Sequence, residues 1–291
     1  MNSPAINLVT APSGQRFLLI WRTEFLFYTP ERRILSEEWN HVRLTSASLP
    51  ESANLINHQL DRPLPFADAS FDGIYAFHVV EHLSPRVSES FLRDLYRLLK
   101  PGGVCRASTP DLEFHATEYL RCLHDEVASP SFEHYARYRW AVCNLIDQCA
   151  RQISGGEMLE VIRRGEFTAD YVKYTNGDLL RFLFPPAPPP GGHPDSNAPK
   201  RNVLRRIAGA VRRRLRSRVS PKSHLELTHE RNLWLFDRVS CSRLFAQAEF
   251  RNVVTTDHRT SHIPNWDRYN FDESVFGSYP LEPSLYMEGT K

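Results

Sequence analysis

The sequence predicts an α/β protein built around a mostly parallel, Rossmann-like sheet. A short apolar run with β-branched and aromatic residues at Ile74–Val80 is typical of a buried strand. A helical pattern begins near Pro85, and a second apolar run follows at Val104–Thr109. Strand, helix and strand of these lengths form a βαβ unit, which requires parallel strands and a right-handed crossover.

The remaining elements are placed by apolar spacing and by helix-breaking residues. Two earlier apolar runs, Phe17–Trp21 and Val42–Thr45, are further candidate strands. Ser84 is predicted to cap the helix of the βαβ unit, because a first-turn proline follows it. Lys100–Gly103 ends that helix with a proline and two glycines. Near the C-terminus, Asp237 is predicted to begin another helix.

The chain divides into four predicted parts. Residues 1–112 and 226–291 are the two halves of one α/β domain, 113–184 is a helical insertion, and 185–225 is a Pro-rich, basic and flexible excursion. The aromatic residues of the insertion recur with loose helical spacing, among them Phe132, Tyr135 and Trp140. They are predicted to form core; a cap over the sheet edge is the alternative interpretation.

Composition limits the class of protein. The 291 residues suffice for a full core, and the five cysteines form no Cys-x-x-Cys pair. This usage favours a reduced, cytoplasmic protein over a disulfide scaffold or zinc site. The N-terminus lacks a basic start and a long apolar core, so no signal peptide is predicted, and no run of eighteen apolar residues predicts a membrane span.

Positive charge is concentrated in one segment. Residues 200–222 hold ten basic side chains and no acidic one, whereas the whole chain carries only +2. Apolar residues four apart, from Val203 to Val219, would form a narrow stripe on a helix there. This pattern predicts contact with an anionic membrane surface or a phosphate-rich partner. The alternative is a solvated segment that only aids solubility. No zinc finger, helix-turn-helix or RNA-binding aromatic motif indicates nucleic acid.

Polar side chains gather where the predicted strands end, which is where open α/β sheets bind ligands. His78, Glu81 and His82 arrive together after the Ile74–Val80 run, and Asp111 follows the next strand. A histidine or carboxylate in this place can act as a general base. The same Glu-His pair also suits a helix start, and Asp111 also suits a turn. His258 and His262 lie in a strand or loop pattern, so no metal site is predicted.

Two stretches resemble a known family. LPFADASFDGIYAFHVVEHL followed by LYRLLKPGGVCRASTPDLE is similar to the central half of class I S-adenosylmethionine-dependent methyltransferases, within a bacterial branch often found with cell-surface glycan genes. HERNLWLFDRVSCSRLFAQAEFRNV, NWDRYNFDESVFG and SLYMEGTK fit the same branch. The resemblance implies a Rossmann-like methyltransferase sheet with an antiparallel C-terminal strand.

The resemblance also implies roles for individual residues. Matching positions place Leu60 and Asp61 near the adenine of S-adenosylmethionine, and Phe77 and His78 near its methionine end. Residues that follow other strands, or that lie in the second matched half, would contact the acceptor: Asp111, His229 and Trp266. One departure stands out, because the chain has no glycine between Gly14 and Gly73, where the family has a Gly-rich turn after its first strand.

The resemblance implies methyl transfer from S-adenosylmethionine to an oxygen or nitrogen of a small-molecule, glycan-linked or lipid-linked acceptor. His78, Glu81 and His82 are the candidate catalytic residues. The alternative function is a non-catalytic relative that has lost the cofactor and binds a partner or a membrane surface through 200–222. On both interpretations the protein is cytoplasmic, with peripheral contact at the inner face of the membrane through that segment.

Overall fold

A computed structural model describes residues 8–21, 37–44, 51–52, 54–59, 62–153, 155–177, 231–269, 271–274 and 279–291. The chain forms two compact units: unit 1 comprises Met1–Phe114 and Leu227–Lys291, and unit 2 comprises His115–Glu226. The predicted excursion at 185–225, with its basic segment, lies outside the described residues, as do Leu60, Asp61 and His229.

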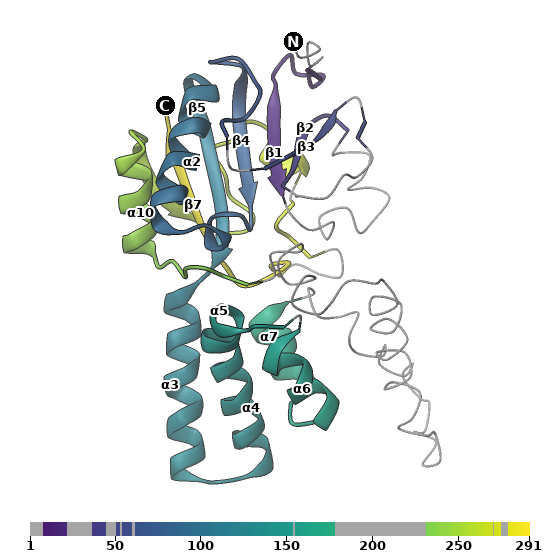
Figure 1. The fold of residues 1–291 in the computed structure, drawn as a ribbon, viewed down its shortest axis with the longest axis vertical. Coiled ribbons are helices and arrows are strands. Elements are labelled where there is room, and N and C mark those ends of the chain that lie inside the picture. The colour runs from purple at the N-terminus through teal and green to yellow at the C-terminus, as the bar shows by residue number, and fades with distance from the viewer. Residues whose placement is uncertain are drawn as a thin grey trace. The chain divides into compact units, whose positions relative to one another are not determined.

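Unit 1 is built on one mixed sheet of seven strands in the order β3-β2-β1-β4-β5-β7-β6 (Figure 1). The first five strands are parallel, and β7 runs antiparallel to both of its neighbours. This confirms the predicted α/β class with an antiparallel C-terminal strand. The strands are β1 (Phe17–Trp21), β2 (Asn40–Leu44), β3 (Leu55–His58), β4 (Phe71–Phe77), β5 (Leu99–Pro110), β6 (Arg251–Thr256) and β7 (Ser284–Thr290).

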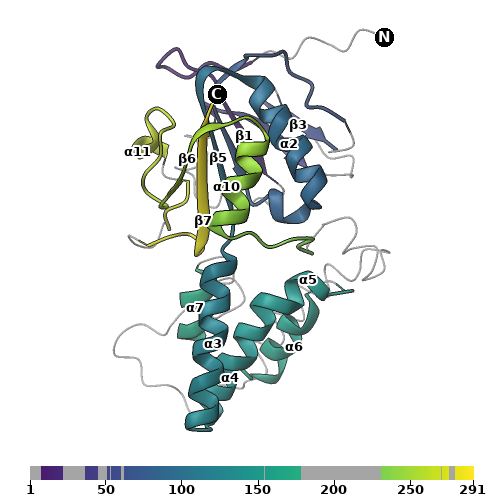
Figure 2. The ribbon, with the colours of Figure 1, turned by 90° about the vertical axis from the view of Figure 1, so that its left-hand side faces the viewer.

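Both faces of the sheet are covered, because side chains alternate between two apolar clusters. Ile74 and Ala76 of β4 join the cluster beneath α2 (Pro85–Leu98) and α10 (Arg238–Gln247). Tyr75 and Phe77 join the opposite cluster, which includes Trp266 of α11 (Trp266–Tyr269). Figure 2 shows α2 and α10 together on one side of the sheet and α11 on the other.

Two boundaries illustrate what local sequence determines. The apolar run was predicted as a strand to Val80, but β4 ends at Phe77, because His78 takes a left-handed φ of 47° that no strand tolerates. A short 3-10 helix, η2 (Val80–His82), follows. The predicted start of α10 is confirmed: Asp237 Oδ1 accepts from Ser240 N at 2.7 Å, within a reciprocal capping box.

Unit 2 is helical. Trp140 is fully buried in its core, as predicted, where its indole nitrogen donates to Asn176 Oδ1 at 2.8 Å. The core prediction was wrong for Phe132 and Tyr135, which are exposed because they lie on the outer side of their helix. No described helix is long and apolar enough to cross a membrane. The elements are α3 (Leu112–Ala128), α4 (Phe132–Val142), the π-helical η3 (Cys143–Asp147), α5 (Gln148–Ala150), α6 (Gly156–Arg164) and α7 (Ala169–Asn176).

Candidate active site

The candidate site lies where β4 ends. His78 is the first residue after the strand, and its amide donates to Ser108 O of the neighbouring β5 at 3.1 Å. A positive φ at a histidine is strained and persists only where the surroundings fix it; such strain is typical of functional sites. The turn directs the chain into η2, which places Glu81 one short turn beyond His78.

His78 is held between two carboxylates from distant parts of the chain. Its Nδ1 lies 3.1 Å from Glu81 Oε1, and its Nε2 lies 3.4 Å from Glu282 Oε2. Ser284 Oγ, at the start of β7, is 3.1 Å from the same Nε2. Sheet pairing explains the meeting, because β7 lies beside β5 and its first residue pairs with Pro110 at the carboxyl end of β5.

The electrostatics of this cluster are set by burial and by mutual attraction. Burial lowers the pKa of His78, but Glu282, Glu81 and the nearby Asp272 outweigh it and raise that pKa to about 9. With that pKa His78 is mainly protonated at neutral pH, and its role as a general base stays a prediction. Burial raises the pKa of Glu282 to about 7, although His78 opposes that shift. The pKa of Glu81 is lowered, because its bond to His78 and the charges of both histidines outweigh burial.

Two carboxylate oxygens of the cluster accept no hydrogen bond from any described residue: Glu81 Oε2 and Glu282 Oε2. Leaving a buried acceptor unpaired costs about 1–3 kcal/mol, more for a charged group. S-adenosylmethionine carries a sulfonium group and an ammonium group. The N–H bonds of the ammonium group could donate to either of these unpaired carboxylate oxygens. The residues at the end of β4 therefore fit the ammonium group of this cofactor.

The structure places the other predicted site residues as follows. Phe77 is buried at the end of β4, with its ring 4.7 Å from that of His78. His82 Nδ1 contacts Arg231 O at 3.0 Å, beside Glu81. Asp111 accepts a hydrogen bond from Glu113 N at 2.9 Å at the start of α3, as expected for a residue that turns the chain. Its role in binding the acceptor stays a prediction. Trp266 is 2% exposed and packs in the apolar cluster that includes Tyr75 and Phe77, where its ring covers Arg106; its acceptor role stays a prediction.

Sequence reasoning missed Glu282 and Ser284. They lie about two hundred positions from His78, and no local spacing connects them to it. The one available signal was their place just before the final predicted strand, because that strand was expected to complete the sheet. Within the described part of the chain, no group of three or more histidine, cysteine or acidic side chains could hold a metal ion.

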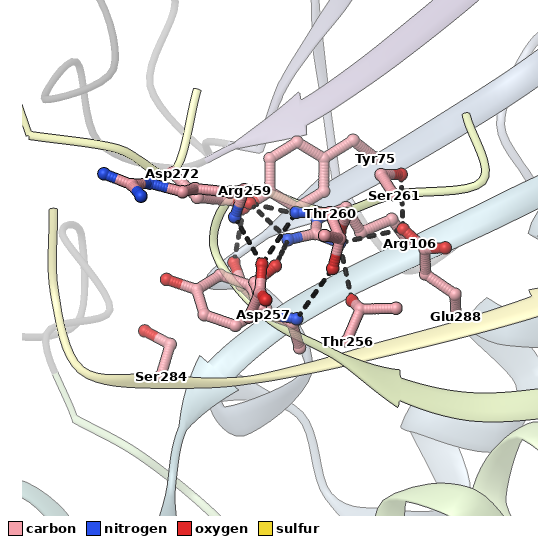
Figure 3. A network of polar contacts seen from close by, with 12 residues as sticks. Tyr75, Arg106, Thr256, Asp257, Arg259, Thr260, Ser261, Asp272, Ser284 and Glu288 are labelled. Carbon is pink, nitrogen blue, oxygen red and sulfur yellow. Dashed lines mark hydrogen bonds and ion pairs between the residues drawn. The ribbon is translucent and has the colours of Figure 1, made fainter. Parts of the chain in front are cut away.

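A second polar cluster supports the sheet behind the site. Arg106 of β5 is fully buried, with its guanidinium between the carboxylates of Asp272 and Glu288 at 2.8 Å each (Figure 3). The guanidinium carbon of Arg106 also lies over two aromatic rings, 4.6 Å from the ring centroid of Trp266 and 4.7 Å from that of Tyr286. The cluster ties β5 and β7 to the loop that follows β6, and Tyr75 of β4 donates to Asp272. It therefore connects β7, which begins at Ser284, with β4, which ends just before His78.

Comparison with known proteins agrees with this geometry. Residues 36–107 match the family described as "Methyltransferase domain". A curated protein of Mycolicibacterium smegmatis, described as a "Probable S-adenosylmethionine-dependent methyltransferase", is 31% identical over 80 residues, which are 28% of this chain and 30% of that protein's length. The match places a methyltransferase domain at residues 36–107, which agrees with the resemblance, and the strand order with its antiparallel β7 is the sheet that the resemblance predicts.

Solved structures show only distant likeness. A methyltransferase of Thermotoga maritima, titled "possible histamine N-methyltransferase", has a TM-score of 0.38 at 14% identity over 95% of this chain and 82% of its own. PigF, solved with SAH, has a TM-score of 0.37 at 10% identity over 96% of this chain and 51% of its own. Likeness at this level identifies no function. The chain spans less than a third of the curated relative named above.

The charges of the cluster predict how stability depends on pH. The pKa of His78 is raised to about 9 in the fold, so protonated His78 stabilises the folded state. This contribution is complete below pH 6.5 and is lost as the pH rises through 9. A raised pKa of Glu282 adds a loss between pH 4.5 and 7, because its ionisation is costly in the fold. We expect the free energy of unfolding to fall by about 1–3 kcal/mol between pH 6.5 and 9.

Urea denaturation at a series of pH values measures this dependence. The double variant His78→Gln/Glu282→Gln, in which neither group titrates, should show a flatter profile over the same range. A wild-type profile as flat as that of the double variant would contradict the assigned charges.

Proposed function

We propose that this chain transfers a methyl group from S-adenosylmethionine to an oxygen or nitrogen of a small-molecule or glycan-linked acceptor. The observation that carries the proposal is the strand order with its antiparallel β7, in a chain whose residues 36–107 match a methyltransferase domain. Open α/β sheets bind ligands outside the carboxyl ends of their strands, and the buried His78 cluster lies there.

The proposal assigns roles to residues of unit 1. Phe77, His78 and Glu81 would hold the methionine end of the cofactor, and the unpaired Glu81 oxygen would accept from its ammonium group. Leu60 and Asp61 are proposed for the adenine. The bound cofactor supplies an electrophilic methyl group on sulfur. The protein's own contribution is orientation and exclusion of water, which strengthens the charges around His78.

Calorimetric titration with S-adenosylmethionine and S-adenosylhomocysteine tests the proposal. We expect both to bind, and Glu81→Gln to weaken S-adenosylmethionine by about tenfold, the value of one hydrogen bond to a charged group. The matched control is Glu89→Gln on α2, which removes an exposed carboxylate paired with Arg93 and should leave binding unchanged. No binding of either compound to the wild type would refute the proposal.

A second candidate is a non-catalytic relative that binds a partner or an anionic membrane surface. Two sequence observations favour it: the absence of glycine after the first strand, and the ten basic residues of 200–222. We propose that this segment makes any peripheral membrane contact at the inner face. A cytoplasmic location accords with the five free cysteines. Vesicles containing anionic lipid should then bind the full chain but not a chain lacking 196–222.

A further inference from the structure

Glu282 is the least compensated carboxylate of the buried clusters. Asp272 and Glu288 each form a 2.8 Å ion pair with Arg106, and Glu81 lies 3.1 Å from His78 Nδ1. Among the described residues, Glu282 Oε2 lies 3.4 Å from His78 Nε2 but accepts no hydrogen bond. Its side chain is nevertheless 9% exposed. The nearby His78 cation is shared with Glu81 and donates no hydrogen bond to Glu282 Oε2, so this unfilled acceptor points to a ligand.

The charges around His78 indicate the chemical class of ligand that would pair with Glu282. Around His78 the described groups include two imidazoles and two carboxylates. Glu81 lies 3.1 Å from His78 and 3.9 Å from His82, whereas Glu282 pairs with His78 at 3.4 Å, and Asp272 is paired with Arg106. Glu282 thus shares its imidazolium with Glu81, and its incompletely compensated negative charge favours a cationic ligand over a neutral or anionic one. A protonated amine brings both a positive charge and N–H donors, whereas a hydroxyl group brings one donor and no charge.

We propose that the acceptor is an amine, which binds Glu282 as an ammonium ion and then loses a proton to its carboxylate. The inference rests on the proposed methyltransferase function and specifies its substrate class. The proton passes from the ammonium nitrogen to a Glu282 oxygen, and the nitrogen keeps the electron pair of the broken N–H bond. That pair forms the new N–C bond to the transferred methyl group, while the pair of the broken C–S bond stays on sulfur.

Neighbouring groups do not fit the role of proton acceptor. Both nitrogens of His78 are engaged with carboxylates, so its ring has no free lone pair when charged. Glu81 is the stronger acid of the two glutamates, because its pKa is lowered. The groups that face Glu282 are His78, Glu81 and, from the next residues of β7, Tyr286, whose hydroxyl donates to Glu282 O. A pKa near 7 suits a group that must gain and lose a proton at neutral pH.

The test uses methylammonium and methanol, a pair of probes of equal size that differ in charge. We would follow the side-chain carboxyl signals of ¹³C-labelled glutamate by NMR in the full chain, and assign Glu282 from Glu282→Asp. Methylammonium should bind saturably at pH 8 and more weakly at pH 6, where Glu282 is protonated. Methanol should not shift the Glu282 signal. Glu282→Gln should weaken methylammonium by about tenfold or more, whereas the exposed control Glu249→Gln should not.

Two results would overturn the proposal: methanol binding as well as methylammonium, or Glu282→Gln binding methylammonium like the wild type. Thermal melting shows whether that variant is folded; if it is not, the wild-type comparison of the two probes decides. Glu282→Asp keeps the charge and should retain part of the binding. Because the titrations need no cofactor, failure here is distinguishable from failure to bind S-adenosylhomocysteine, which would refute the methyltransferase function instead.

Discussion

Replacing Arg106 by methionine is expected to lower the free energy of unfolding by about 3–5 kcal/mol, the cost of removing one partner from a buried ion pair. Methionine keeps much of the side chain's length and apolar packing but removes its charge. Asp272 and Glu288 would then be left buried without a cation. Four further bonds would also be lost, including those from Nη1 to Thr256 Oγ1 at 2.8 Å and from Nη2 to Asp257 O at 2.7 Å.

Arg259 provides the matched control, because it lies in the loop after β6 that Arg106 contacts. Its guanidinium pairs with Glu273 at 2.8 Å but is 49% exposed. Arg259→Met should therefore cost no more than about 1 kcal/mol, the usual value of a surface ion pair. Urea denaturation of both variants measures the difference. Equal losses in the two variants would show that the buried cluster contributes no more than an exposed pair.

The size of this effect follows from the number of elements that Arg106 connects. Its own strand lies beside β7, which carries Glu288, while Asp272 and Asp257 belong to the chain after β6. Thr256 of β6 accepts from Arg106, and Tyr75 of β4 donates to Asp272, so four strands meet at this cluster. A bidentate, planar cation is suited to this position, and lysine could not replace its donors.

Local sequence was sufficient to predict the α/β sheet and several of its strands. Phe17–Trp21 is the observed β1, and Val104–Thr109 lies within β5, because apolar runs flanked by breakers encode buried strands. The end of β4 could not be predicted in the same way. Val79 and Val80 continue the apolar pattern, and the turn at His78 depends on contacts with Glu81 and Glu282 that only the folded chain provides.

The candidate site was predicted in part. His78 and Glu81 were found because strand ends collect functional side chains, and the structure does bring them together at 3.1 Å. Glu282 was not found, because its meeting with His78 depends on β7 returning beside β5. The charge of His78 was also not accessible from sequence: it requires the burial of two carboxylates at the two nitrogens of one ring. With that charge His78 would act as a cation that holds the two carboxylates, and its catalytic role stays a prediction.

The second large effect is expected on catalysis, from His78→Ala. If the chain transfers methyl groups as proposed, removal of this cation should lower kcat/KM by about 100-fold, because both flanking glutamates lose the group that orients them. His78 is here a positioning residue for Glu282. Steady-state methyl transfer from S-adenosylmethionine to a panel of amines measures the loss.

The pH profile separates this role from general loss of structure. His78 lowers the pKa of Glu282, so its removal should raise that pKa above its present value of about 7 and shift the lower limb of the kcat/KM profile to higher pH. His78→Lys, which restores a positive charge without the ring, should move the limb back toward the wild-type position. A variant that loses activity with an unshifted limb would assign His78 a purely structural role, because packing alone does not change the charge beside Glu282.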